Sequence, residues 1–315
     1  MWFKNLRLYR LNKPFILSAE DFGGKLEQQA FQACPRMQAS SFGWVSPLGR
    51  QGQLLVHAAN GRMLICTRKE EKILPPSVIR ELVAEQVADL EEERMRKVGR
   101  REKNNIRDEI LQDLLPRALC RSVYTFAYVA PEDGFIAVDA TSQVRAEELL
   151  GLLRKTLGSL SVVPLSVAHA PAAIMTRWLA QEQSMPAGFE LGGECVLRDS
   201  GEDAGIVRCR NQDLRGQEIE AHIEAGKQAI RLSLHWSGVL SFILDEDMSI
   251  KRLRFSDIVE EQAAEVDADD ELARFDSDFT IMSLELARFV PELTELFGGV
   301  EDVDHLGQAD DQAAA

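Results

Sequence analysis

The segment 77–115 constrains the fold most, because its apolar pattern is helical at both ends and absent in the middle. Between Glu91 and Asn105 only Met95 and Val98 are apolar. A helix that is polar on all sides has left the core or crosses solvent. We therefore predict a helical protrusion at about 77–116, a hairpin with its tip away from the main core. The apolar stripes on either side are Ile79, Leu82, Val83, Val87 and Leu90, then Ile106, Ile110, Leu111, Leu114 and Leu115.

The tip of this protrusion is also the most basic run in the chain. The whole chain has a net charge of −15, but residues 256–315 alone hold 18 acidic and two basic side chains. Residues 1–121 hold 21 basic and 15 acidic side chains. Such asymmetry is typical of a polyanion-binding face beside a segment that polyanions avoid. A solvated helix is the alternative, since three glutamates precede the run. Its cations are Arg94, Arg96, Lys97, Arg100, Arg101 and Lys103.

The rest of the chain predicts an α+β fold of antiparallel sheets with interleaved helices, because strands follow one another through short turns and helices are grouped between them. The strongest local signal is Asn60-Gly61, which lies between two apolar runs and predicts a hairpin. We also expect a strand over 2–11, helices over 23–33 and 279–296, and a turn over 43–49. The expected regions are 1–170, which carries the protrusion, 171–299, and a disordered acidic tail over 300–315.

Composition excludes several classes of protein. Hydrophobic residues make up 45% and charged residues 28% of the chain, as in proteins with a real core. No apolar run approaches the roughly 20 residues of a membrane span, so we expect no membrane partner. Five cysteines at 34, 66, 120, 195 and 209 form no Cys-x-x-Cys pair, which favours a reducing cytosol.

Cofactor and catalytic motifs are absent from the sequence. Neither a phosphate-binding Gly-x4-Gly-Lys loop nor a dinucleotide-binding Gly-x-Gly-x-x-Gly turn occurs, and the five histidines lack ligand spacing. We therefore expect no cofactor, no metal and no catalytic residue. One alternative is a Mg²⁺-dependent nuclease, because clustered carboxylates suit a hard cation. A second alternative is an acidic scaffold that binds only proteins. The clustered carboxylates are Asp245, Asp247, Asp267, Asp269 and Asp270.

Several stretches, in one order along residues 2–299, resemble the RdgC family of recombination-associated DNA-binding proteins of proteobacteria. They include WFKNLRLYRL (2–11), NGRMLICTRKEEKILPPSVI (60–79), HIEAGK (222–227), IKRLRF (250–255) and RFDSDFTIMSLEL (274–286). The resemblance implies an elongated, curved, non-enzymatic subunit that forms a closed ring-shaped homodimer. It implies that double-stranded DNA, and also single-stranded DNA, binds without base specificity in the hole. It further implies association with the nucleoid and restraint of RecA action.

The resemblance also assigns residues. It implies that the ring is lined by Lys69, Lys72, Arg117, Lys227, Lys251, Arg252 and Arg254, together with the basic run of the protrusion. It places Leu119 and Asn211 at the contacts that close the ring. Family members have an aromatic residue and a lysine at these two positions, so the closing contacts of this chain differ from the family pattern.

Overall fold

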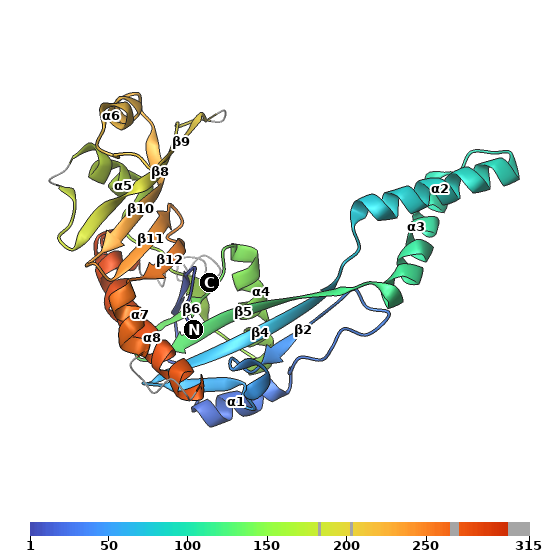
Figure 1. Ribbon diagram of the computed structural model, residues 1–315, viewed down its shortest axis with the longest axis horizontal. Helices are drawn as coiled ribbons and strands as arrows, with labels where there is room; N and C mark the ends of the chain where they lie inside the picture. The colour runs from blue at the N-terminus through green and yellow to red at the C-terminus, as the bar shows by residue number, and fades with distance from the viewer. Residues whose placement is uncertain (182–183, 202–203, 265–270, 302–315) are drawn as a thin grey trace, which may run out of the picture.

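Two antiparallel sheets organise the chain (Figure 1). The computed structural model describes residues 1–181, 184–201, 204–264 and 271–301. The first sheet has seven strands, in the order β2 (Ser40–Val45), β4 (Arg62–Lys72), β5 (Cys120–Ala130), β6 (Phe135–Val138), β1 (Arg7–Leu11) and β7 (Val162–Pro164), with β3 (Val56–Ala59) also paired to β4. The second has five, in the order β12 (Ile250–Phe255), β11 (Leu240–Asp245), β10 (Gln228–Trp236), β8 (Phe189–Arg198) and β9 (Ile206–Arg210). The predicted α+β class is confirmed.

The central part of the first sheet is buried on both faces, whereas the ends of β4 and β5 next to the hairpin are partly exposed. Helices α1 (Ala19–Glu27) and α4 (Gln143–Leu157) pack on one face, where they meet Ala127 and Val129 of β5. The alternate residue Tyr128 points to the other face and contacts Phe279 of helix α8 (Glu271–Glu295), with ring centroids 5.9 Å apart. The strands are apolar at successive positions because each side chain has a core to enter.

One continuous core joins the two sheets. The inner face of the second sheet packs on α5 (Pro171–Ala180) and α8, and Phe289 of α8 lies 5.3 Å from Trp236 and 5.0 Å from Phe242 between ring centroids. Backbone hydrogen bonds close the seam, because Leu6 and Ile250 exchange N–H to O bonds of 2.8 and 2.9 Å. The amino-terminal segment therefore extends the second sheet at β12.

The molecule is a curved arc (Figure 1). The second sheet and helix α6 (Gln217–Glu224) lie at one end, and a helical hairpin lies at the other. The hairpin consists of α2 (Pro76–Arg94) and α3 (Arg100–Leu114), and Met95 begins the turn in a left-handed conformation with φ of 50°. Its own small core is separate from the two larger ones and contains Val87, Val98 and Ile106, flanked by Val83, Leu90 and Ile110.

Three elements have other bounds in the structure than the sequence predicted. The strand expected over 2–11 begins only at Arg7, because the residues before it pair with β12. The helix expected over 23–33 is α1, which starts earlier because the Ser18 hydroxyl accepts a bond from the Asp21 N–H at 3.1 Å. The turn expected over 43–49 overlaps β2, whose Trp44 is buried and donates to Thr156 Oγ1 at 2.9 Å.

The proposed division at residue 170 and the ring-shaped homodimer stay predictions. Helix α8 contacts β3, so this helix of the expected carboxy-terminal region packs against the first sheet. Helix α7 (Asp257–Ala264) lies against α8. Residues 302–315 of the expected tail lie outside the described residues. Among the helices that are described, none is long and apolar enough to cross a membrane.

The separate core of the hairpin predicts local rather than global loss of stability. Ile106→Ala should destabilise the hairpin by about 2–5 kcal/mol, because it empties a core shared by few side chains. Amide hydrogen exchange should lose protection over 76–114, with a nearly unchanged melting temperature. The control is Phe289→Ala, which removes a fully buried ring from the main core and should lower protection throughout. Equal loss of protection everywhere in the Ile106→Ala variant would contradict a separate hairpin unit.

Candidate nucleic-acid interface

Arginines and lysines gather on the outer face of the second sheet. Directly paired residues of antiparallel strands share a face, and Arg208 pairs with Val196, which pairs with Arg231. The next residues along these strands, Cys195 and Leu232, enter the core, so the arginine row points away from it. We call this surface the open basic face. Its cations are Arg198, Arg208, Arg210, Arg231, Lys251, Arg252 and Arg254.

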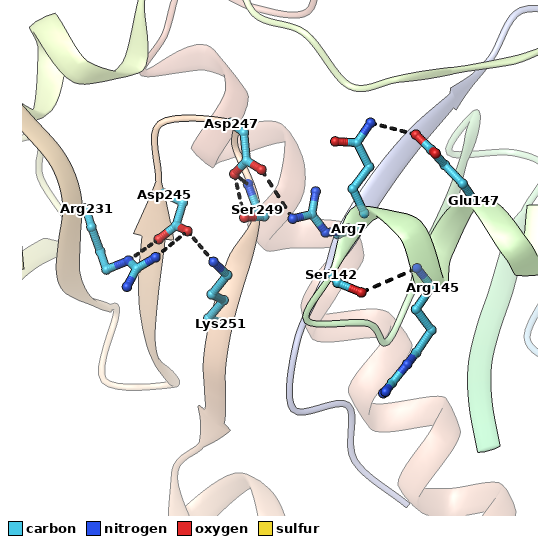
Figure 2. Close-up of polar contacts among 10 residues, drawn as sticks. Arg7, Ser142, Arg145, Glu147, Arg231, Asp245, Asp247, Ser249 and Lys251 are labelled. Carbon is cyan, nitrogen blue, oxygen red and sulfur yellow. Dashed lines mark hydrogen bonds and ion pairs between the residues drawn. The ribbon is translucent and has the colours of Figure 1, made fainter. Parts of the chain in front are cut away.

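Asp245 holds two of these cations in place (Figure 2). Arg231 Nε lies 2.5 Å from Asp245 Oδ1 and Arg231 Nη2 lies 2.9 Å from Oδ2, while Lys251 Nζ donates to Oδ2. The hydrogen bond to Asp245 raises the pKa of Arg231. One carboxylate therefore orients two cations and offsets one of their two positive charges.

The remaining cations of the open basic face differ in their partners. Glu194 accepts from Arg252 at 2.8 Å, and Arg198 forms an ion pair with Glu246 at 2.8 Å. Within the described residues, Arg208 and Arg254 form no ion pair. A cavity of about 260 Å³ lies among four of the arginines, namely Arg208, Arg210, Arg231 and Arg252. Glu194 also lines this cavity and pairs with Arg210 and Arg252, so the four arginines and one glutamate leave an excess of positive charge that suits a phosphate.

The tip of the hairpin, residues 94–103, contains both paired and unpaired cations. Glu102 forms ion pairs with Arg94 at 2.8 Å and Arg96 at 3.0 Å, and the hydrogen bond from Arg96 lowers the pKa of Glu102. Glu91 forms an ion pair with Lys97 at 2.9 Å. The exposed side chains of Arg100, Arg101 and Lys103 have no ion-pair partner in the described part of the chain. Residues 94–103 hold six basic side chains and one acidic side chain, so the tip keeps a net positive charge, and these three residues are its cations without an ion pair.

The other four predicted lining residues are spread over the arc. Lys69 lies 2.7 Å from Glu148, and this hydrogen bond raises the pKa of Lys69 and ties β4 to α4. Lys227 pairs with Asp199. Lys72 at the end of β4 and Arg117 after α3 lie at the base of the hairpin, with no ion pair among the described residues. The predicted set is therefore divided among the tip, the hairpin base, the second sheet with Lys227 just before it, and Lys69 on the first sheet.

The two predicted ring-closure residues lie beside different sheets, and Figure 1 shows the start of β5 next to the hairpin and β9 in the second sheet. Leu119 directly precedes β5 at the hairpin base, and 77% of its surface is exposed. Asn211 follows β9 at the far end and has a left-handed φ of 53°. They cannot meet within one subunit. Their separation is compatible with contacts between different subunits, and their role in ring closure stays a prediction.

Four residues of the open basic face could not be recognised from sequence. Arg208 and Arg210 alternate with less exposed residues in IVRCR, and Arg231 alternates in the same way along β10. This period of two indicates one face of a strand. It does not tell which strands are neighbours, so the convergence with Arg198 and IKRLRF depends on the pairing order of the sheet.

Two of the clustered carboxylates of the nuclease alternative lie in the described residues, and both bind side chains of the chain itself. Asp245 binds Arg231 and Lys251, and Asp247 accepts from Ser249 and from Arg7 (Figure 2). Burial raises the pKa of Asp247, but these hydrogen bonds outweigh burial and the net shift is downward. Asp267, Asp269 and Asp270 lie outside the described residues. The described part of the chain contains no group of three or more His, Cys, Asp or Glu that could hold a metal ion.

Comparisons with known proteins match nearly the whole chain. A family model described as "Putative exonuclease, RdgC" matches residues 1–300. The recombination-associated protein RdgC of Aeromonas hydrophila is 46% identical over 301 residues, which cover 96% of this chain and 99% of the relative. Those of Tolumonas auensis and Pseudomonas aeruginosa are 45% and 44% identical, covering 95% and 96% of this chain and 99% and 98% of the relatives. The relatives' names mention recombination and no enzymatic activity. The chain belongs to the RdgC family.

Proposed function

We propose that the chain is a non-enzymatic protein that binds duplex DNA without base specificity and restrains RecA-dependent recombination. The observation that carries this proposal is the open basic face, where seven basic side chains lie on one side of a sheet. The names of the relatives support a role in recombination. Such a protein acts in the cytoplasm, in association with the nucleoid.

The proposal agrees with the charge distribution. A net charge of −15 disfavours unguided contact with a polyanion, but binding depends on the potential at the surface that meets the phosphates. The open basic face and the unpaired cations of the tip supply that potential locally. Arginine and lysine contacts to phosphate carry no sequence information, so binding through these surfaces is independent of base sequence.

The curvature of the chain (Figure 1) supports a ring-shaped homodimer as part of this proposal. Two arcs related by a twofold axis close a ring when both ends of each arc contact the partner, and such closed symmetry is the common form of homodimers. In this proposal Leu119 at the hairpin base and Asn211 beyond β9 lie near the two junctions. The open basic face and the hairpin tip then face the enclosed DNA.

Two alternatives compete with this proposal. A Mg²⁺-dependent nuclease is favoured by the word exonuclease in the family description, and opposed by the internal partners of Asp245 and Asp247. An acidic scaffold that binds only proteins would not need seven basic side chains on one sheet face. The protein-binding scaffold predicts no DNA binding at all. A nuclease that binds DNA away from the tip predicts that charge reversal at the tip leaves DNA affinity unchanged.

Reversing the unpaired charges at the tip should weaken DNA binding without loss of stability. We expect the double variant Arg100→Glu/Arg101→Glu to bind duplex DNA more weakly, and the slope of log K against log salt to fall by about 0.9 for each phosphate that the variant no longer neutralises. Fluorescence anisotropy at several salt concentrations measures both. The matched control is Arg36→Glu/Arg50→Glu, an equal charge change at exposed residues outside the proposed surface. If the double variant shows unchanged DNA affinity and an unchanged salt slope, the hairpin is not part of the DNA interface.

Binding should depend little on base sequence and leave the DNA intact. Competition between unrelated duplexes of equal length, at one salt concentration and with Mg²⁺ present, measures both properties. We expect similar affinities, because the basic side chains are placed to contact phosphates. A preference above about 1000-fold, the lower end of typical specific binding, would contradict the proposal. Shortening of the labelled strands by purified protein would instead support the nuclease.

A further inference from the structure

We propose that a pocket beside the amino-terminal segment stacks one unpaired base of single-stranded DNA on Trp2, with Lys4 and Arg254 at the adjoining phosphates. The pocket has a volume of about 550 Å³ and is lined by residues 2–5, by β12 and by the start of α7. The inference rests on the proposed function in one respect, that the chain binds DNA. It adds a separate subsite and a preferred form of the ligand.

Trp2 forms a fixed aromatic platform. Its ring lies 4.6 Å from that of Phe255, between centroids, at an interplanar angle of 48°. The backbone on either side is held, because Phe3 N–H donates to Met282 Sδ and Leu253 N–H donates to the Lys4 carbonyl at 2.8 Å. Phe3 is fully buried, whereas Trp2 is half-buried and borders the pocket. A ring that is already positioned loses little entropy when a base stacks on it.

Charges around the platform suit a nucleotide. Lys4 and Arg254 are exposed, line the pocket and form no ion pair within the described residues. Asp257 and Glu260 line it from α7. Carboxylates accept hydrogen bonds from the exocyclic amino groups of bases, while the cations attract phosphate. The pocket therefore offers an apolar ring, cations and base-edge acceptors on three different elements.

The stacking platform selects unpaired bases. In a duplex, both faces of a base are covered by its neighbours, so only a single strand, a gap or a frayed end can place a base on a protein aromatic ring. Arg254 belongs to the open basic face as well, so the pocket adjoins the surface proposed for duplex DNA. A strand that leaves a duplex on this face could thus reach Trp2 without crossing the molecule.

Intrinsic fluorescence tests stacking directly, because the other three tryptophans of the chain are buried. Trp44, Trp178 and Trp236 are 1%, 3% and 1% exposed. We expect oligodeoxycytidylate, whose bases carry an exocyclic amino group, to quench the emission of the full chain with saturation, and a mixed-sequence duplex of the same length to quench it far less. The Trp2→Phe variant, which keeps a ring but removes this fluorophore, should lose the quenching and still bind.

Affinity measured with a labelled single strand completes the test. Trp2→Leu should weaken single-strand binding by about 5- to 150-fold, the range for loss of one stacked base, whereas Trp2→Phe should retain most of it. Lys4→Glu, a change at an exposed residue that does not depend on repacking Trp2, should weaken single-strand binding and leave duplex affinity nearly unchanged. If Trp2→Leu fails to fold, fluorescence quenching of the wild type and the single-strand affinity of Lys4→Glu still test the subsite.

The outcomes separate this inference from the proposed function. A chain that binds duplex and single strand, without quenching and with equal affinities for Trp2→Leu and wild type, would overturn the Trp2 subsite alone. Duplex binding without any single-strand binding would overturn it too. Absence of binding to either form of DNA would contradict the proposed function itself. Saturable quenching by the single strand, together with selective loss in Lys4→Glu, would support the subsite.

Discussion

The hydrophobic core between the two sheets sets the shape on which every proposed binding surface depends. Helix α8 contacts the first sheet through Phe279, which meets Tyr128, and the second sheet through Phe289, which meets Trp236. These two positions lie about 15 Å apart along a helix that rises 1.5 Å per residue. Because all four rings are buried, separating the sheets would expose several aromatic side chains, each worth roughly 1.5–3 kcal/mol or more of burial. The curvature of the arc is therefore built into the core.

This rigid arc explains how an acidic chain can present basic surfaces. The open basic face is attached to the sheet that α8 fixes, and its carboxylates, Glu194, Asp245 and Glu246, each hold a cation at a defined position. The partly exposed pairs of Glu194 and Glu246 add little stability. Their effect is on orientation and on local charge, which is reduced but remains positive. Interactions of exposed charges fade beyond about 8 Å at physiological salt, so acidic regions elsewhere on the chain weaken this local potential little.

Local sequence signals predicted the elements well and their neighbours poorly. Asn60-Gly61 fixed the β3–β4 turn because both residues adopt positive φ there, and the polar gap after Leu90 located the hairpin turn near Met95. By contrast, no local signal shows that residues 2–6 leave β1 and pair with β12, since that pairing joins positions some 240 residues apart along the chain. For the same reason, the sequence did not predict that Arg198, Arg208, Arg210 and Arg231 share one sheet face. The resemblance to the RdgC family predicted Lys251, Arg252 and Arg254 as lining residues, and the pairing order of β8 to β12 places these four arginines on the same sheet face.

Encirclement of DNA by the basic inner surface is the central claim, and retention on circular DNA tests it most directly. Protein bound to a covalently closed plasmid would be washed at a salt concentration that removes phosphate contacts, and the protein remaining would be compared before and after the plasmid is cut once. A closed ring predicts retention on the circle and release from the linear form. Equal release from both forms at the same salt concentration would contradict encirclement.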